Sequence, residues 1–174
     1  MKQLDGTALK RLHREWRRRT NGRIAIILDG VATPVNVGSI VRSAAAYGVD
    51  HLWCAAGSAT PASAGAAKTA LGTDRYVPWE EVPSTLDAID AARAAGFEIV
   101  ALELTDDATP LHDHAPTAAI CLLVGHEDHG LTKATLAACD RAAFLPMVGR
   151  VGSLNVATAT AIALYELRRQ EWSA

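Results

Sequence analysis

The first part of the chain has the hydrophobic pattern of an amphipathic helix. Four apolar residues recur four positions apart, while Arg and Lys fill much of the remaining circumference; the four are Leu4, Ala8, Leu12 and Trp16. This spacing follows the 3.6-residue period of a helix with one apolar stripe. We therefore predict a basic helix over residues 4–19, ended by a turn at residues 20–22.

From residue 24 onward, short apolar runs alternate with helical patterns. Residues 24–28 are continuously apolar, which predicts a strand covered on both faces, as in a parallel sheet. Further strands are predicted at residues 51–55, 98–104, 118–124 and 142–145. Helices are predicted at residues 36–47, 83–95, 131–138 and 153–170. Asn36 and Ser153 are natural N-caps, Gly48 and Gly96 are natural stops, and residues 56–73 are interpreted as a loop with one helical turn.

Strands that alternate with helices predict an α/β domain with a mostly parallel sheet flanked by helices. A length of 174 residues suits one compact domain with a short appendage. We expect a basic N-terminal helical extension over residues 1–22 and a single domain over residues 23–174.

Charge is distributed unevenly between these two parts. Residues 1–23 hold eight Lys and Arg against Asp5 and Glu15, so they carry a charge of +6, whereas the whole chain carries −2 and the rest therefore −8. A basic arm on an acidic body indicates a polyanionic partner, either nucleic acid or an anionic membrane surface. The membrane alternative is the weaker one, because the apolar stripe is thin and carries a single Trp; we expect no membrane partner.

Cysteine usage and hydropathy indicate the compartment. The three cysteines, Cys54, Cys121 and Cys139, are odd in number and form no C-x-x-C pair, which argues against a disulfide framework and a cysteine zinc site. They are typical of small core residues in a reducing cytosol. Neither a long apolar run nor a signal-peptide pattern is present, so we expect a soluble cytoplasmic protein.

Ligands of parallel α/β sheets bind beyond the carboxyl ends of the strands. Three loops rich in glycine and polar residues follow predicted strands, at residues 29–42, 125–130 and 146–155. The sequence contains no G-x-G-x-x-G, no G-x-x-x-x-G-K-[ST] and no G-x-S-x-G, which argues against dinucleotide binding, a P-loop and a hydrolase elbow. The run His126-Glu127-Asp128-His129 lacks a third metal ligand at metal-site spacing, so no metal is predicted.

The three loops together carry more information than any one of them. Their sequences are Pro34-x-Asn36-x-Gly38-Ser39-Ile40-x-Arg42, then Leu123-Val124-Gly125-x-Glu127-x-x-Gly130-Leu131, and then Leu145-Pro146-Met147-x-Gly149-x-x-x-Ser153-Leu154-Asn155-Val156-Ala157. In order and spacing these resemble the three motifs of the SpoU (TrmH-like) RNA 2′-O-ribose methyltransferases, over most of residues 24–170. The resemblance implies a SPOUT-type fold with a C-terminal trefoil knot that holds S-adenosylmethionine, and a homodimer.

The resemblance also implies roles for five residues at the catalytic centre. Arg42 is expected to engage the ribose 2′-hydroxyl and a nearby phosphate, with Asn36 supporting it, Glu127 at the centre, and Ser153 and Asn155 lining the pocket. An arginine is a poor general base because its pKa exceeds about 12, so orientation and charge stabilisation are the roles expected of Arg42. Each residue also has a plainer interpretation, as a helix cap, a surface group or an acceptor for loop amides.

Two further sets follow from the resemblance. Backbone around five residues is expected to cradle the cofactor: Gly125, Leu145, Met147, Gly149 and Leu154. Six basic residues are expected to contact RNA phosphates, with a solvated surface as the alternative: Arg11, Arg14, Arg18, Arg19, Lys68 and Arg75.

The function expected from these observations is transfer of a methyl group from S-adenosylmethionine to a ribose 2′-hydroxyl in structured RNA. Transfer RNA is the preferred substrate, by guanosine 2′-O-methylation, because a short basic extension without a separate RNA-binding domain is similar to the tRNA guanosine branch. The alternatives are ribosomal RNA and a non-catalytic RNA-binding protein on the same fold.

Overall fold

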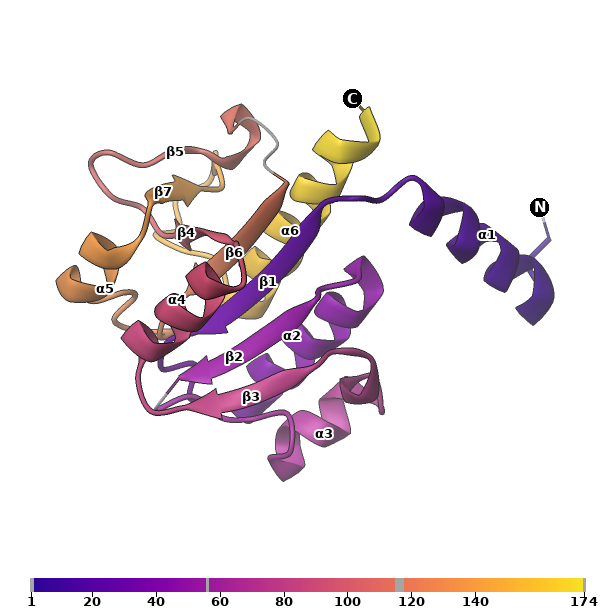
Figure 1. The fold of residues 1–174 in the computed structure, drawn as a ribbon, viewed down its shortest axis with the longest axis horizontal. Helices are drawn as coiled ribbons and strands as arrows, with labels where there is room; N and C mark the ends of the chain where they lie inside the picture. Colours follow the sequence, from indigo (N-terminus) through magenta and orange to yellow (C-terminus); the bar gives the residue numbers. More distant parts are fainter. Residues whose placement is uncertain (1, 56, 115–117, 174) are drawn as a thin grey trace.

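The computed structural model describes residues 2–55, 57–114 and 118–173. Seven parallel strands form one sheet in the order β3-β2-β1-β6-β4-β7-β5, with helices on both faces (Figure 1). The strands are β1 Arg23–Leu28, β2 His51–Ala55, β3 Trp79–Val82, β4 Glu98–Leu102, β5 Thr109–Pro110, β6 Ala119–Val124 and β7 Arg141–Phe144. The helices are α1 Gly6–Arg18, α2 Pro34–Tyr47, α3 Ala64–Ala70, α4 Thr85–Ala94, α5 Lys133–Ala138 and α6 Val156–Ser173, with short 3-10 helices η1 Asp74–Tyr76 and η2 Leu111–Asp113.

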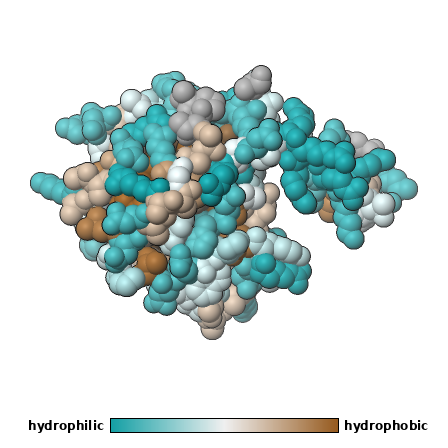
Figure 2. Space-filling view, in the orientation of Figure 1, coloured by the Kyte–Doolittle hydropathy of each residue, from teal (hydrophilic) through white to brown (hydrophobic). Residues whose placement is uncertain are grey.

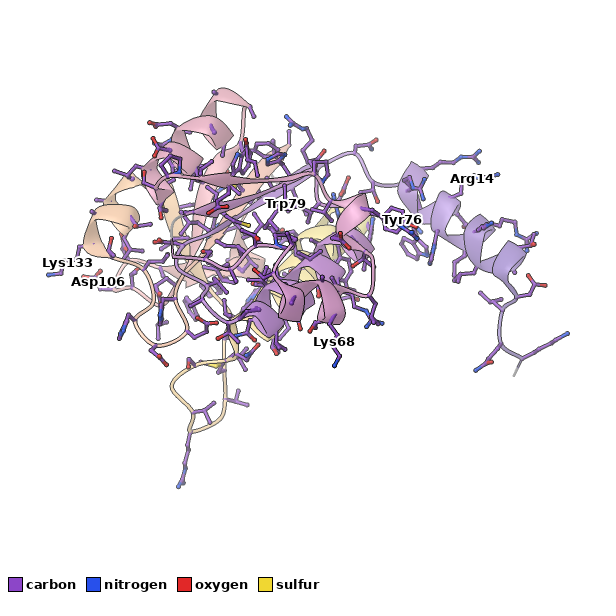
Figure 3. All side chains as sticks on the ribbon, turned by 90° about the horizontal axis from the view of Figure 1, so that it is seen from below. Arg14, Lys68, Tyr76, Trp79, Asp106 and Lys133 are labelled. Atoms are coloured by element: carbon purple, nitrogen blue, oxygen red, sulfur yellow. The ribbon has the colours of Figure 1, made fainter. Side chains whose placement is uncertain are left out.

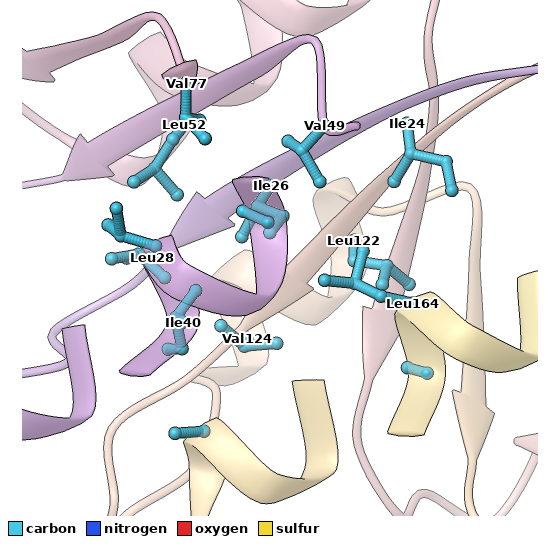
Figure 4. Packing of buried hydrophobic residues seen from close by; sticks show 14 of the residues in the cluster. Ile24, Ile26, Leu28, Ile40, Val49, Leu52, Val77, Leu122, Val124 and Leu164 are labelled. Atoms are coloured by element: carbon cyan, nitrogen blue, oxygen red, sulfur yellow. The ribbon is translucent and has the colours of Figure 1, made fainter. Parts of the chain in front are cut away.

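The predicted α/β class and mostly parallel sheet are confirmed, and β1 lies at the centre with β2 and β6 beside it. Ile26 and its neighbours on one face of β1 join a core cluster with α2 and α6, where Figure 4 shows Ile40 and Leu164. Ile27 points to the opposite face, into a second cluster beneath α4 and α5. Side chains alternate between the faces of a strand, so the continuously apolar run is the consequence of helices on both sides.

Small residues allow α2 to pack closely on α3. A Cβ added at Gly38 would collide with the carbonyl oxygen of Ala66 and would stand 2.7 Å from the Cβ of Thr69. Residues 56–73 were predicted to form a loop with one helical turn, but they contain the seven-residue helix α3. Ala66 and Ala70, four positions apart, form its buried side. Ala56, at the start of that predicted loop, lies outside the described residues, as do Met1 and Ala174 at the outer ends of the two predicted domains.

Two predicted helix starts were wrong. Helix α2 begins at Pro34 with Thr33 at the N-cap, so Asn36 lies within the first turn and its side chain is available for other contacts. Helix α6 begins at Val156. Its first amides are capped by Asn155, whose Oδ1 accepts hydrogen bonds from the Ala157 and Thr158 amides at 3.0 and 3.2 Å, and not by Ser153.

Strand β3 was missed because it has no apolar run: it is an edge strand whose two central residues, Glu80 and Glu81, are exposed. Between β7 and α6, residues 145–155 form a loop without helix or strand, which projects from the rest of the molecule in Figure 3. The trefoil knot implied by the resemblance stays a prediction.

Helix α1 agrees with the predicted basic helix to within two residues and extends away from the sheet (Figure 1). Asp5 caps it, accepting hydrogen bonds from the Thr7 and Ala8 amides at 3.0 and 2.8 Å. None of its residues is buried. In the described part of the chain, no helix combines the length and the apolar character needed to cross a membrane.

Candidate functional site

A cavity of about 920 Å³ lies at the carboxyl ends of β4, β6 and β7, where a ligand site is expected in a parallel sheet. Its walls are the segments that follow these strands, residues 102–105, 124–131 and 144–156, with Ala159 of α6. All five residues predicted to hold a cofactor line it: Gly125, Leu145, Met147, Gly149 and Leu154. Glu127, Ser153 and Asn155 line it as well. Eight of the ten residues predicted for catalysis and cofactor binding therefore share one cavity.

A chain of hydrogen bonds joins three predicted site residues from distant parts of the sequence. The Asn36 Nδ2 donates to Glu127 Oε1 at 2.8 Å, and the Asn155 Nδ2 donates to the Asn36 Oδ1 at 3.0 Å. Asn36 thus lies between the other two and connects α2 to the cavity wall. The amide of Asn36 is held at both ends, which fixes its orientation.

Glu127 also caps the start of α2. Its Oε1 accepts a hydrogen bond from the Thr33 amide at 3.2 Å, and its Oε2 accepts one from the Ala32 amide at 3.4 Å. The first amides of a helix lack partners within the helix and favour a negative group. The chain reaches this position through a tight turn at Gly30, whose φ of 72° favours glycine. The plainer interpretation of Glu127, as an acceptor for loop amides, is therefore part of its structural role.

These contacts lower the pKa of Glu127. Burial by itself would raise the pKa of this carboxyl, but the hydrogen bonds from the Asn36 side chain and from backbone at Glu127 and Thr33 outweigh burial and bring the pKa to about 2. Glu127 is therefore ionised at neutral pH. With most of its lone pairs engaged, it serves to position α2 and Asn36 rather than to accept a proton.

The cavity has an acidic lining. Three carboxylates line it, those of Glu103, Glu127 and Asp128, and no Lys or Arg is among its lining residues in the described part of the chain. Glu103 was missed by the sequence reasoning. Its Oε1 and Oε2 accept hydrogen bonds from the Leu104 and Leu131 amides, both at 3.1 Å. The strand was predicted over residues 98–104, with Glu103 inside it, whereas β4 ends at Leu102, so Glu103 in fact follows the carboxyl end of a strand as the three selected loops do.

Two histidines stack at the edge of the same cavity. The rings of His126 and His129 lie 4.8 Å apart at 22°, and the His126 Nδ1 accepts a hydrogen bond from the Asp128 amide at 3.0 Å. Over the described residues, no group of three or more His, Cys, Asp and Glu side chains is placed to hold a metal ion.

Two predicted catalytic residues are not part of the cavity lining: Asn36, which is hydrogen-bonded to lining residues, and Arg42. Arg42 is exposed on α2 and, within the described residues, its side chain makes no hydrogen bond. Ser39 and Ser43, neighbours of Arg42 along the helix, line a second, shallow groove of about 530 Å³ between α2 and α6. Tyr165 lies on the other side of this groove and is 48% exposed. Arg42 therefore stands beside a partly apolar face of the molecule.

The residues predicted to contact RNA are all exposed but lie on separate elements. Arg11, Arg14 and Arg18 belong to α1 and Arg19 is its C-cap; Figure 2 shows this helix as a hydrophilic projection. Lys68 lies on α3, not in a loop, and points outward in Figure 3. Arg75 is held over the Tyr76 ring, with its Nη2 donating to the Tyr76 hydroxyl at 2.7 Å.

Residues 23–165 match the model of the SpoU rRNA Methylase family. The chain is 34% identical over 154 residues to the tRNA (guanosine(18)-2′-O)-methyltransferase of Escherichia coli K12, covering 87% of this chain and 65% of the relative. It is 35% identical over 148 residues to the 23S rRNA (guanosine-2′-O-)-methyltransferase RlmB of a Burkholderia species, covering 84% of this chain and 59% of that relative.

Among solved structures, the SpoU methyltransferase AviRb from Streptomyces viridochromogenes, in complex with the cofactor AdoMet, is similar with a TM-score of 0.79 and 32% identity. The match covers 89% of this chain and 63% of that one. The chain thus spans less than two thirds of the length of each of these three proteins.

Proposed function

The chain belongs to the SpoU rRNA methylase family, and on that premise we propose that it transfers the methyl group of S-adenosylmethionine to a ribose 2′-hydroxyl of structured RNA. The observation that carries the proposal is the hydrogen-bonded series Asn155, Asn36 and Glu127 beside a cavity lined by the third motif. A helix cap at each position would not require that the three side chains meet.

The cavity fits a cationic cofactor. S-adenosylmethionine, when bound, supplies an electrophilic methyl group on a positively charged sulfur. The acidic lining of Glu103, Glu127 and Asp128, without a lysine or arginine among the lining residues described, favours a cation. The five lining residues expected to hold the cofactor are Gly125, Leu145, Met147, Gly149 and Leu154. The AdoMet complex of AviRb supports the same choice of cofactor.

The residues of the chain position one another and the substrate. Glu127 fixes the first turn of α2, and Asn36, held between Glu127 and Asn155, fixes these two cavity-lining side chains relative to each other. Ser153 is exposed at the cavity wall, where its hydroxyl is available to a substrate. Arg42 orients the ribose and an adjacent phosphate and stabilises the charge on the attacking oxygen.

Arg42 reaches the reacting atoms in a homodimer. It stands on the exposed side of α2, beside a groove whose walls include the exposed Ile162 and Tyr165. A second copy that covers this groove places the Arg42 of one subunit against the cavity of the other. The active site is then completed by the dimer, in keeping with an exposed Arg42 and a cavity that has no arginine among its described lining residues.

Transfer RNA is the preferred substrate, with guanosine 2′-O-methylation as the reaction. The Escherichia coli relative is named for that reaction on tRNA. Ribosomal RNA is the second candidate, since the Burkholderia relative, named for 23S rRNA, is similar to the same degree.

The test is incubation of the purified protein with radiolabelled S-adenosylmethionine and either total tRNA or ribosomal RNA, followed by nuclease digestion and mass spectrometry. We expect a 2′-O-methylated nucleoside, recovered from the tRNA. Recovery from ribosomal RNA alone would assign the second substrate. Cofactor binding without transfer to either RNA would contradict the enzymatic proposal and favour a non-catalytic RNA-binding protein.

A further inference from the structure

The basic helix α1 is held against the far end of α6 by contacts between aromatic and guanidinium side chains. The ring of Trp16 in α1 lies 4.9 Å from the ring of Trp172 in α6. The guanidinium of Arg19 lies over the Trp16 ring, 4.6 Å from its centroid. The Arg19 Nη2 also donates a hydrogen bond to the Trp172 carbonyl at 3.4 Å. Aromatic and cation–π contacts of this kind are favourable beyond the apolar area that they bury.

The joint between α1 and β1 is held by hydrogen bonds to the same end of α6. The Trp172 Nε1 donates to the Thr20 Oγ1 at 2.9 Å, and that hydroxyl donates to the Trp16 carbonyl, also at 2.9 Å. The Glu171 carboxylate accepts hydrogen bonds from the Asn21 amide and, at 2.7 Å, from the Gly22 amide. The turn that joins α1 to β1 contains Gly22, and its Asn21 and Gly22 amides are held by hydrogen bonds to α6.

Arg168 anchors this joint in the body of the molecule. It is 2% exposed, and its guanidinium donates to the Gly22 carbonyl at 2.6 Å, to the Tyr47 and Gly48 carbonyls at 2.9 Å, and to Glu171 at 3.1 Å. A buried charge is tolerated only where it is fully hydrogen-bonded. Arg168 therefore ties the end of α2, the start of β1 and α6 to one another, and the arm begins from a fixed point.

The fastening leaves the basic side of α1 free. On a helix with 100° per residue, five basic residues fall on the side opposite Trp16: Lys10, Arg11, Arg14, Arg17 and Arg18. All five are exposed. The body of the protein carries a charge of −8, so the arm is the part of the molecule that attracts a polyanion.

Helix α6 separates this arm from the catalytic residues by a set distance. Asn155, at the start of α6, lies at the cavity, and Trp172 lies at its other end. With 18 residues in the helix and 1.5 Å per residue, the two ends are roughly 27 Å apart. One continuous helix thus connects the methyl-transfer site to the point where the arm is held.

We propose that α1 is a fixed arm that binds backbone phosphates of structured RNA roughly 27 Å from the ribose being methylated, with Trp172 as the residue that positions it. The substrate is then an RNA that holds its shape over at least that distance, and a short hairpin that fills only the cavity lacks the second contact. This inference rests on the proposed function for the identity of the polyanion. The arm does not suit a membrane, because Trp16, the largest apolar residue of its stripe, is engaged with Trp172.

Equilibrium binding tests the proposal without requiring methyl transfer. Fluorescence anisotropy would compare a labelled full-length tRNA transcript with a labelled hairpin of about ten nucleotides, at several salt concentrations. For the double variant Arg14→Ala/Arg18→Ala we expect tRNA affinity to fall about tenfold or more and the salt slope to flatten by about two, while hairpin affinity is unchanged. Lys133→Ala, which removes one positive charge on the opposite side of the molecule in Figure 3, is the control and should change neither affinity.

The positioning role of Trp172 has its own variants. Trp172→Ala should weaken tRNA binding by about tenfold with no loss of charge. Trp172→Phe should restore most of the affinity, because an aromatic ring still contacts Trp16. Affinity for S-adenosylmethionine should stay unchanged in both variants. Equal losses for tRNA and hairpin, or no loss for either, would overturn the proposal. A change of mass in light scattering on deletion of residues 2–19 would also overturn it, by assigning the arm to subunit contacts. Failure of methyl transfer in the wild-type protein concerns the proposed function alone, since these assays measure binding.

Discussion

The side-chain amide of Asn36 donates to the carboxylate of Glu127 across 2.8 Å, although the two residues stand 91 positions apart in the chain. This bond joins the first turn of α2 to the loop after β6, and Asn155 extends it to the start of α6. Three loops that are polar and glycine-rich for separate local reasons are thereby held in one arrangement.

Glu127→Gln removes the charge but keeps the shape of the side chain. Because the native pKa is about 2 and that of an unfolded glutamate about 4.3, the carboxylate stabilises the fold above pH 4.3 and loses that effect as the pH falls toward 2. We expect the variant to be less stable by about 1–3 kcal/mol at pH 7. Urea denaturation at pH 7, 5, 4 and 3 measures the difference. It should be constant down to pH 5 and shrink below pH 4; a difference that grows at acidic pH would contradict the assigned contacts.

Arg42→Ala should reduce turnover by roughly a hundredfold or more without changing stability or cofactor affinity, since the side chain is exposed and lies outside the cavity. Mixing the Arg42→Ala variant with the Asn155→Ala variant tests whether the active site is shared between two subunits. If Arg42 acts on the cavity of the other subunit, a mixed dimer holds one intact site, and random exchange of two inactive variants restores about a quarter of wild-type activity. Radiolabel transfer before and after subunit exchange measures this, and no recovery would place the whole site within one chain.

Glu103→Gln should weaken the binding of S-adenosylmethionine about three- to tenfold, because a carboxylate in the cavity lining favours the sulfonium cation. S-adenosylhomocysteine lacks that positive sulfur, so its affinity should change less. Glutamine has a single acceptor oxygen and can serve only one of the Leu104 and Leu131 amides, which donate to different oxygens of Glu103; that loss is common to both ligands. Calorimetric titration of both ligands measures the ratio. Asp106→Asn, the same change of charge on an exposed residue outside the cavity lining, is the control, and an equal loss for both ligands would remove Glu103 from discrimination.

Two glycines of the motifs should respond differently to alanine. At Gly38 a Cβ meets the Ala66 backbone carbonyl and the Thr69 Cβ, so Gly38→Ala should lower the free energy of unfolding by about 1–3 kcal/mol. At Gly149 a Cβ meets nothing within 4 Å, and Gly149→Ala should leave stability within about 0.5 kcal/mol of the wild type. Thermal denaturation of both variants checks this, and equal destabilisation would show that α2 and α3 do not set the requirement at Gly38.

Elements with strong local signals were predicted correctly from the sequence. The apolar run of β1 and the helix stop at Gly48, with φ of 64°, both depend on a few adjacent residues. The start of α2 was misplaced because Thr33 and Pro34 compete with Asn36 for the same role. Only tertiary structure decides that competition, since the Asn36 side chain is engaged by Glu127 and Asn155.

The sequence placed most of the residues that line the cavity in one set, but it did not predict how they contact one another. Motif spacing brought Gly125, Met147 and Leu154 into one set, and they line one cavity. It could not indicate that Glu127 caps α2, since the Thr33 amide lies 94 positions away. Glu103 escaped notice because it belongs to none of the three motifs, and Trp172 because its partner, Trp16, lies at the other end of the chain.

The central position of β1 in the sheet determines the order in which strands can pair during folding. Its two neighbours are β2, which follows after a single helix, and β6, which ends at Val124. Parallel pairing of strands far apart in sequence is slow, because the entropy cost of closing a long loop comes before the stabilising contacts between the strands form. On the ribosome, the N-terminal half can pair β1, β2 and β3 early, but one edge of β1 stays open until β6 has been synthesised. Glu127 follows β6 in the chain, so the cap on α2 can be added only after both neighbours of β1 have been synthesised.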